Sequence, residues 1–108
     1  MIQTTPNFSF RVPSPDGMST VFISEEESGP HIQIFIGKAG SSVSAWSNAL
    51  AAMATFALRT TSLNEVIDTL ADITTDRVAY RDGVSSRSGP EALVIALRTY
   101  RDITSSSG

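Results

Sequence analysis

The sequence predicts an α+β domain in which an N-terminal antiparallel sheet of about three strands packs on a C-terminal set of about three helices. Two observations predict it. Apolar and polar residues alternate in three short segments before residue 37, and helical periodicity with capping signals follows from residue 41. A chain of 108 residues with 41% hydrophobic composition can form one modest core. We therefore expect a single domain over residues 1–103 and a disordered tail over residues 104–108.

The predicted strands are residues 8–12 (FSFRV), 20–24 (TVFIS) and 32–36 (IQIFI), because each alternates as a strand with one buried face does. The segment PSPDG between the first two favours a turn, since proline fixes φ and Asp-Gly tolerates positive φ. The segment EEESGP predicts a second, acidic turn whose charge keeps a sheet edge soluble.

The first helix should begin near Ser41 or Ser42, where a serine can cap it, and end near Arg59. It carries two neighbouring apolar stripes. The first consists of Val43, Trp46, Leu50, Met53 and Ala57, and the second of Ala45, Ala49, Ala52 and Phe56. Trp46 is expected in the core because it belongs to the first stripe. A helix that is apolar over most of its circumference must be covered on two sides, which predicts contact with another helix or another subunit.

Two further helices are predicted from their start signals. Residues 62–65 (SLNE) form a capping box that opens the second helix. The third opens with Gly89 as its N-cap, Pro90 at the first helical position and Glu91 in the first turn. Residues 74–88 between them are expected to be a polar connection.

Charge and composition exclude several classes of function. A net charge of −3 argues against charge-driven binding to a nucleic-acid polymer. The chain has no cysteine and one histidine, so we expect no metal and no cofactor. The first residues lack a basic region followed by an apolar run, and no apolar segment reaches the roughly 18 residues of a membrane span. We expect a cytoplasmic protein without a membrane partner.

The segment IGKAGSS, residues 36–42, is the first candidate binding site. Free backbone N–H groups and the dipole at a helix N-terminus attract anions, Lys38 adds a charge, and Gly40 lets a phosphate approach Ser41 and Ser42. The alternative is a capped strand-to-helix turn without a ligand, and the serines suit both interpretations. The spacing differs from the GxxxxGK[ST] loop of nucleotide triphosphatases, so ATP hydrolysis is not expected.

The segment SSRSGPE, residues 85–91, is the second candidate site. Arg87 and Ser88 precede a helix N-terminus, which suits an anion. Glu91 opposes this interpretation, because a carboxylate in the first turn already stabilises the dipole and would repel a phosphate. A capped helix start with a surface arginine is the alternative.

The polar connection contributes further candidates. Tyr80 is a better candidate than Trp46 to stack on a base, because Trp46 belongs to an apolar stripe. Arg77 and Arg81 either join Arg87 at the site or pair with Asp76 and Asp82 on the surface.

The order of these segments resembles the TSCPD domain. The resemblance covers roughly residues 19–101: a strand, GKAGSS, an Ala-rich helix ending ALR, SLNEVIDTLADI and RSGPEALVIALRTY. This domain occurs at the C-terminus of adenosylcobalamin-dependent ribonucleotide reductases and as free-standing short proteins. The name-giving motif falls on residues 87–91, where the family's cysteine is Gly89, so a thiol or metal role proposed for the family cannot apply here. The resemblance implies a fold and a nucleotide-related setting without a reaction.

We expect a binding protein rather than an enzyme, because no Ser/His/Asp set is recognisable. The leading interpretation is a non-catalytic homo-oligomer that binds a phosphorylated small molecule, a nucleotide or nucleotide-derived signal. Small oligomeric phage proteins that sequester immune signalling nucleotides as an anti-defence device are a further association, without a shared motif. The alternatives are a regulatory or interaction module of a ribonucleotide reductase and a hydrolase of a nucleotide signal.

Overall fold

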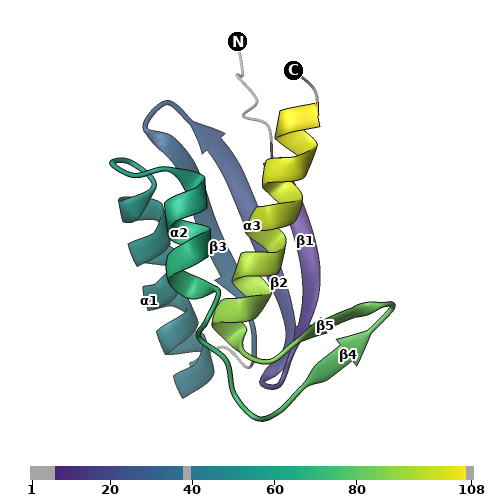
Figure 1. The fold of residues 1–108 in the computed structure, drawn as a ribbon. Coiled ribbons are helices and arrows are strands. Elements are labelled where there is room, and N and C mark those ends of the chain that lie inside the picture. Colours follow the sequence, from purple (N-terminus) through teal and green to yellow (C-terminus); the bar gives the residue numbers. More distant parts are fainter. Residues whose placement is uncertain (1–6, 38–39, 107–108) are drawn as a thin grey trace.

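A three-stranded antiparallel sheet forms the first part of the fold. The computed structural model describes residues 7–37 and 40–106. The sheet contains β1 (Asn7–Ser14), β2 (Gly17–Glu26) and β3 (Gly29–Phe35) in the order β1-β2-β3. The helices α1 (Ser42–Ala57), α2 (Leu63–Leu70) and α3 (Gly89–Ser106) lie on one side of this sheet (Figure 1). The predicted α+β class and the three predicted strands are confirmed.

The two faces of the sheet differ in burial. Val21 pairs with Ile34 and Ile23 with Ile32, and these four side chains are buried beneath the helices. The opposite face exposes Phe22 and Phe35, whose rings meet edge to face with centroids 5.5 Å apart. The alternation in the sequence therefore separates a core face from an outer face that no element within residues 7–37 and 40–106 covers.

Serine side chains begin all three helices. The hydroxyl of Ser41 accepts a hydrogen bond from the N–H of Ser44 at 3.2 Å, and that of Ser62 accepts from the N–H of Glu65 at 3.1 Å, so both predicted starts are confirmed. At α3 the cap is Ser88, not Gly89. The hydroxyl oxygen of Ser88 accepts a hydrogen bond from the N–H of Glu91, whereas glycine has no side-chain oxygen that could do so.

The helix α3 is the centre of the core. Its most deeply buried side chains are Ala92, Leu93, Val94, Ala96 and Leu97. It continues to Ser106, past the expected domain end at residue 103. The hydroxyl of Thr104 donates to the carbonyl of Tyr100 at 2.9 Å, which supports the last turn. Residues 104–106, expected in a disordered tail, are thus helical, and residues 107–108 lie outside the described part.

The helix α1 contacts the sheet through a different face from either predicted stripe. Its buried residues are Ser47, Ala51, Ala54 and Thr55. The hydroxyl of Thr55 accepts from the N–H of Ile32 at 2.9 Å and donates to the carbonyl of Ala51 at 2.8 Å, which sets how the helix is rotated against β3. Trp46, Met53 and Phe56 therefore remain 36%, 63% and 60% exposed, and the expectation that Trp46 lies in the core is wrong.

Residues 74–88 are not merely a connection. They contain a hairpin of β4 (Ala79–Arg81) and β5 (Val84–Ser86), which projects to one side of the domain (Figure 1). Asp82 and Gly83 form its turn with φ of 54° and 81°. The hydroxyl of Ser86 donates to the carbonyl of Pro13, which attaches the hairpin to β1.

Candidate functional site

The helices α1 and α3 begin at the same end of the molecule, next to the turn between β1 and β2 (Figure 1). Trp46, in the first part of α1, lies against Gly89 at the start of α3. A Cβ atom added to Gly89 would lie only 2.3 Å from Cη2 of Trp46. The indole ring therefore occupies the space that any side chain at residue 89 would need, including the cysteine implied by the family resemblance.

A pocket of about 310 Å³ opens beside this contact. Its walls come from the β1–β2 turn, residues 73–77 and the start of α3, with Trp46 between them. Arg77 and Asp16 are the two charged residues among those that line it. The lining thus includes an aromatic residue and one residue of each charge, a composition that suits a small ligand with polar groups.

The glycines described at the predicted loop before α1 have a backbone conformation that would let a ligand come close to the chain. Gly37 and Gly40 have φ of 70° and 83°, a conformation that favours glycine. Among the described residues, nothing lies within 4 Å of the position that a Cβ atom of Gly40 would take. Lys38, the charged residue of the predicted site, lies outside the described residues.

The N-terminus of α1 has backbone donors that find no acceptor among the described residues. Ser41 provides the cap, and its carbonyl accepts from the N–H of Ala45. The N–H groups of Ser42 and Val43 have no acceptor within the described part of the chain. The first turn carries no acidic residue. This end can therefore accept an anion.

The N-terminus of α3 is already satisfied. The buried Ser88 hydroxyl accepts from the N–H of Glu91 at 2.9 Å and donates to the carbonyl of Ile73 at 2.5 Å. A carboxylate oxygen of Glu91 accepts from the N–H of Arg87 at 3.1 Å. Of the two predicted sites, α1 is therefore the more open to an anion, and Ser88 is engaged by the protein itself.

Two other predicted residues lie elsewhere. Tyr80, 72% exposed, and Arg81 are on β4, and the hairpin extends away from the start of α1 (Figure 1). The structure does not bring them together with Gly40 and Ser42. The sequence predicted Trp46 as a core residue and left Arg77 either at the site or in a surface ion pair. Gly89 was the feature that could have indicated a large side chain packed against the start of α3.

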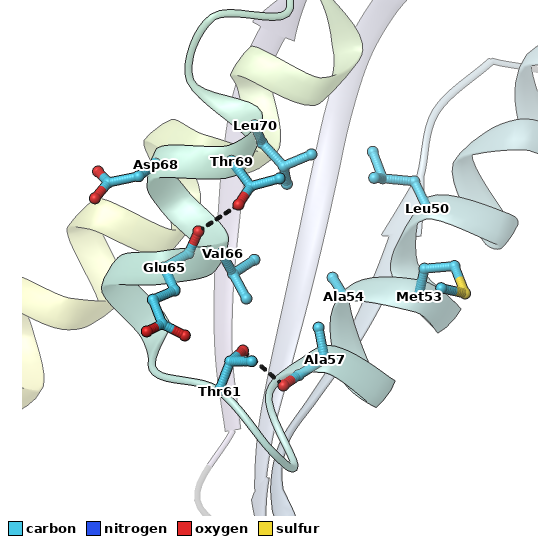
Figure 2. Close-up of a pocket in the computed structure, with 10 residues that line it drawn as sticks. All are labelled: Leu50, Met53, Ala54, Ala57, Thr61, Glu65, Val66, Asp68, Thr69 and Leu70. Atoms are coloured by element: carbon cyan, nitrogen blue, oxygen red, sulfur yellow. Dashed lines mark hydrogen bonds between the residues drawn. The ribbon is translucent and has the colours of Figure 1, made fainter.

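A second pocket, of about 580 Å³, lies between α1 and α2, where no site was predicted (Figure 2). Leu50 and Leu70 face each other across it, and Ala54 and Val66 lie deeper along its walls. The lining is mainly apolar, while Glu65 and Asp68 belong to the α2 side. This groove is suited to an apolar side chain.

One buried phenol has a structural role. The hydroxyl of Tyr100 donates to a carboxylate oxygen of Glu25 at 2.8 Å, tying α3 to β2. Burial first, and then this carboxylate, raises the pKa of Tyr100 to about 12. The phenol is therefore protonated at neutral pH.

Within residues 7–37 and 40–106, no cluster of three metal-ligating side chains occurs, and no helix could cross a membrane. The sequence model of the TSCPD domain matches residues 3–101 of the 108-residue chain. No curated protein and no solved structure matches it.

Proposed function

Because the chain belongs to the TSCPD domain family, we propose that it is a non-catalytic, self-associating protein that binds a phosphorylated small molecule. The family is linked to ribonucleotide reductases, which supports a nucleotide or nucleotide-derived signal as the ligand. The observation that carries the proposal is the pocket between Trp46 and Arg77, at the end where α1 begins. Sequestration of a signalling nucleotide in a phage is one use of such binding.

Each part of a nucleotide has a counterpart at this end. The exposed side of Trp46 offers a stacking surface, and such stacking contributes about 1–3 kcal/mol per base. The planar guanidinium of Arg77 suits bidentate contact with a phosphate. Asp16 can accept hydrogen bonds from an amino group or a sugar hydroxyl. The N–H groups of Ser42 and Val43 provide a further anion site.

A capture assay tests the proposal. The protein is incubated with nucleoside mono-, di- and triphosphates, cyclic nucleotides and ADP-ribose. It is then washed and heated, and the released molecules are identified by mass spectrometry. Binding without conversion predicts intact ligand. Altered ligand would indicate a hydrolase, and the absence of any captured ligand would contradict the proposal.

A matched pair of variants locates the site. Arg77→Ala removes a charge-assisted contact and should weaken binding about tenfold or more. Arg98→Ala removes an exposed arginine on α3 and should leave binding unchanged. Equal effects of both variants would point to net charge instead of the pocket.

An interaction module of a ribonucleotide reductase is the second candidate. The exposed aromatic pair on the outer sheet face, Phe22 and Phe35, favours it, since such side chains commonly mark protein contacts. Under this alternative, Phe35→Ser should abolish co-sedimentation with the enzyme and Arg77→Ala should not. The ligand-binding proposal predicts the reverse pattern in the capture assay.

A further inference from the structure

The chain contains two Asp-Gly pairs, Asp16-Gly17 and Asp82-Gly83. In such a pair the backbone nitrogen of the glycine can attack the side-chain carboxyl of the aspartate, because the glycine has no side chain that hinders the approach. The first pair lies at the turn of the β1–β2 hairpin and the second at the turn of the β4–β5 hairpin. The sequence does not rank the two pairs, whereas the structure distinguishes them.

The Asp82-Gly83 pair is open to this attack. These two residues form the whole loop, since Arg81 and Val84 are the closing pair of the ladder. Both are exposed, and the N–H of Gly83 has no acceptor among the described residues. Within residues 7–37 and 40–106, Asp82 is the one residue other than glycine with a positive φ, a conformation that costs free energy when a side chain is present. The attacking nitrogen is thus unengaged, and its turn is strained.

The hairpin around this pair is short enough to open at its tip. The strands β4 and β5 have three residues each, and a two-stranded ribbon of this kind is marginally stable on its own. Its attachments lie at the other end. There the hydroxyl of Ser86 donates to the carbonyl of Pro13, and the N–H of Thr75 donates to the carbonyl of Arg87 at 3.1 Å. The tip can therefore change conformation, as the attack requires, while the base of the hairpin stays attached.

The Asp16-Gly17 pair is held in place by Ser14. The buried hydroxyl of Ser14 accepts from the N–H of Asp16 at 3.2 Å and donates to the carbonyl of Gly17 at 2.7 Å. Gly17 also belongs to β2 and pairs with Ser14 in the long β1–β2 ladder. These bonds must break before the backbone of this turn can rearrange, so the folded protein protects this pair.

We propose that Asp82 is a site of spontaneous succinimide formation and isomerisation to isoaspartate in the folded protein, and that Asp16 is not. The nitrogen of Gly83 forms a bond to Cγ of Asp82, and the carboxyl hydroxyl leaves with the amide proton as water. A water molecule then opens the ring. Its attack on Cγ restores aspartate, whereas its attack on the former backbone carbonyl of Asp82 leaves a chain that runs through Cβ and Cγ, which is isoaspartate.

The product changes the tip of the hairpin and spares the domain. It lengthens the backbone of the turn by one carbon atom and leaves a free carboxylate where the backbone carbonyl was. Such a turn no longer matches the pairing of Arg81 with Val84, so the exposed Tyr80 beside it loses its fixed position. The bonds of Ser86 and Arg87 at the base remain, and the rest of the fold does not depend on the turn.

Ageing of the purified protein at mildly acidic pH, followed by peptide mapping, tests the proposal. Isoaspartate and aspartate have equal mass but different backbones, which electron-transfer fragmentation distinguishes, and the succinimide is lighter by one water. In the folded protein, isoaspartate should accumulate at residue 82 about tenfold or more faster than at residue 16, because the bonds of Ser14 must first break there. In urea, where neither turn is formed, the two rates should be similar.

Two variants provide matched controls. Ser14→Ala removes the side-chain bonds to Asp16 and Gly17, so it should raise the rate at residue 16 and leave the rate at residue 82 unchanged. Gly83→Ala places a methyl group beside the attacking nitrogen and should lower the rate at residue 82 both in the folded protein and in urea. Equal rates at the two residues in the folded protein, or isoaspartate at residue 82 in urea only, overturns the proposal.

Discussion

Replacing Gly89 with alanine should destabilise the fold through Trp46. The new Cβ atom would lie 2.3 Å from Cη2 and 3.2 Å from Cζ2 of the indole, whereas carbon atoms pack at about 3.5–4.0 Å. The start of α3 cannot retreat easily, because the buried hydroxyl of Ser88 bonds both Ile73 and Glu91. The indole ring must therefore shift by roughly 1 Å or more, and its contacts with α3 must change.

The cost follows from two opposing effects. Overpacking of this kind costs about 1–3 kcal/mol, while alanine in a helix gains up to about 1 kcal/mol over glycine. We expect Gly89→Ala to lower the free energy of unfolding by about 1–2 kcal/mol and Tm by roughly 5–15 °C. Urea unfolding monitored by circular dichroism, at one protein concentration for all variants, measures this change.

The double variant Trp46→Leu/Gly89→Ala provides the control. A smaller side chain at residue 46 leaves space for the new methyl group, so Gly89→Ala should cost little in that background and the two changes should couple by about 1 kcal/mol or more. Additive effects, or a fully stable single variant, would show that the indole of Trp46 does not clash with a methyl group at residue 89.

Three further predictions concern single residues. Thr55→Val should lower the free energy of unfolding by about 1–3 kcal/mol, because it leaves the N–H of Ile32 buried without an acceptor, and Thr55→Ser, which keeps the hydroxyl, should cost less in urea unfolding. Because the pKa of Tyr100 is raised to about 12, its contribution to stability is complete below about pH 10 and falls between pH 10 and 12. Relative to wild type, Tyr100→Phe should therefore lose less stability across that window in pH-dependent unfolding. Gly40→Val should reduce ligand capture, since a β-branched residue disfavours φ of 83° and crowds an approaching anion.

Local signals allowed much of the fold to be predicted. Alternation placed β1, β2 and β3, and serine caps placed the starts of α1 and α2, because both depend on residues close in sequence. The rotation of α1 could not be read in this way. Its two apolar stripes look equally suited to a core, and the deciding contact joins Thr55 to Ile32, 23 residues earlier. The short β4–β5 hairpin had only Asp82-Gly83 as its signal.

The candidate site could likewise be predicted only where it depends on residues close in sequence. The geometry around Gly40 and Ser41 is local, and the sequence indicated it. The pocket depends on how α1 and α3 meet, so Trp46 and Arg77 could be assigned to it only from the structure. The Ser88 hydroxyl is buried and makes two hydrogen bonds within the protein. The bond from the N–H of Glu91 is a local helix cap, whereas the bond to the carbonyl of Ile73, 15 residues earlier, could be known only from the structure.

Native mass spectrometry of freshly purified protein tests self-association and ligand binding in one experiment, because it reports subunit number and bound small molecules together. We expect a homo-oligomer that carries a phosphorylated small molecule and releases it intact on collisional activation. The Arg77→Ala protein should remain a homo-oligomer and carry much less of this molecule. A monomer at the mass of the bare chain, after incubation with the nucleotide mixture, would contradict the account.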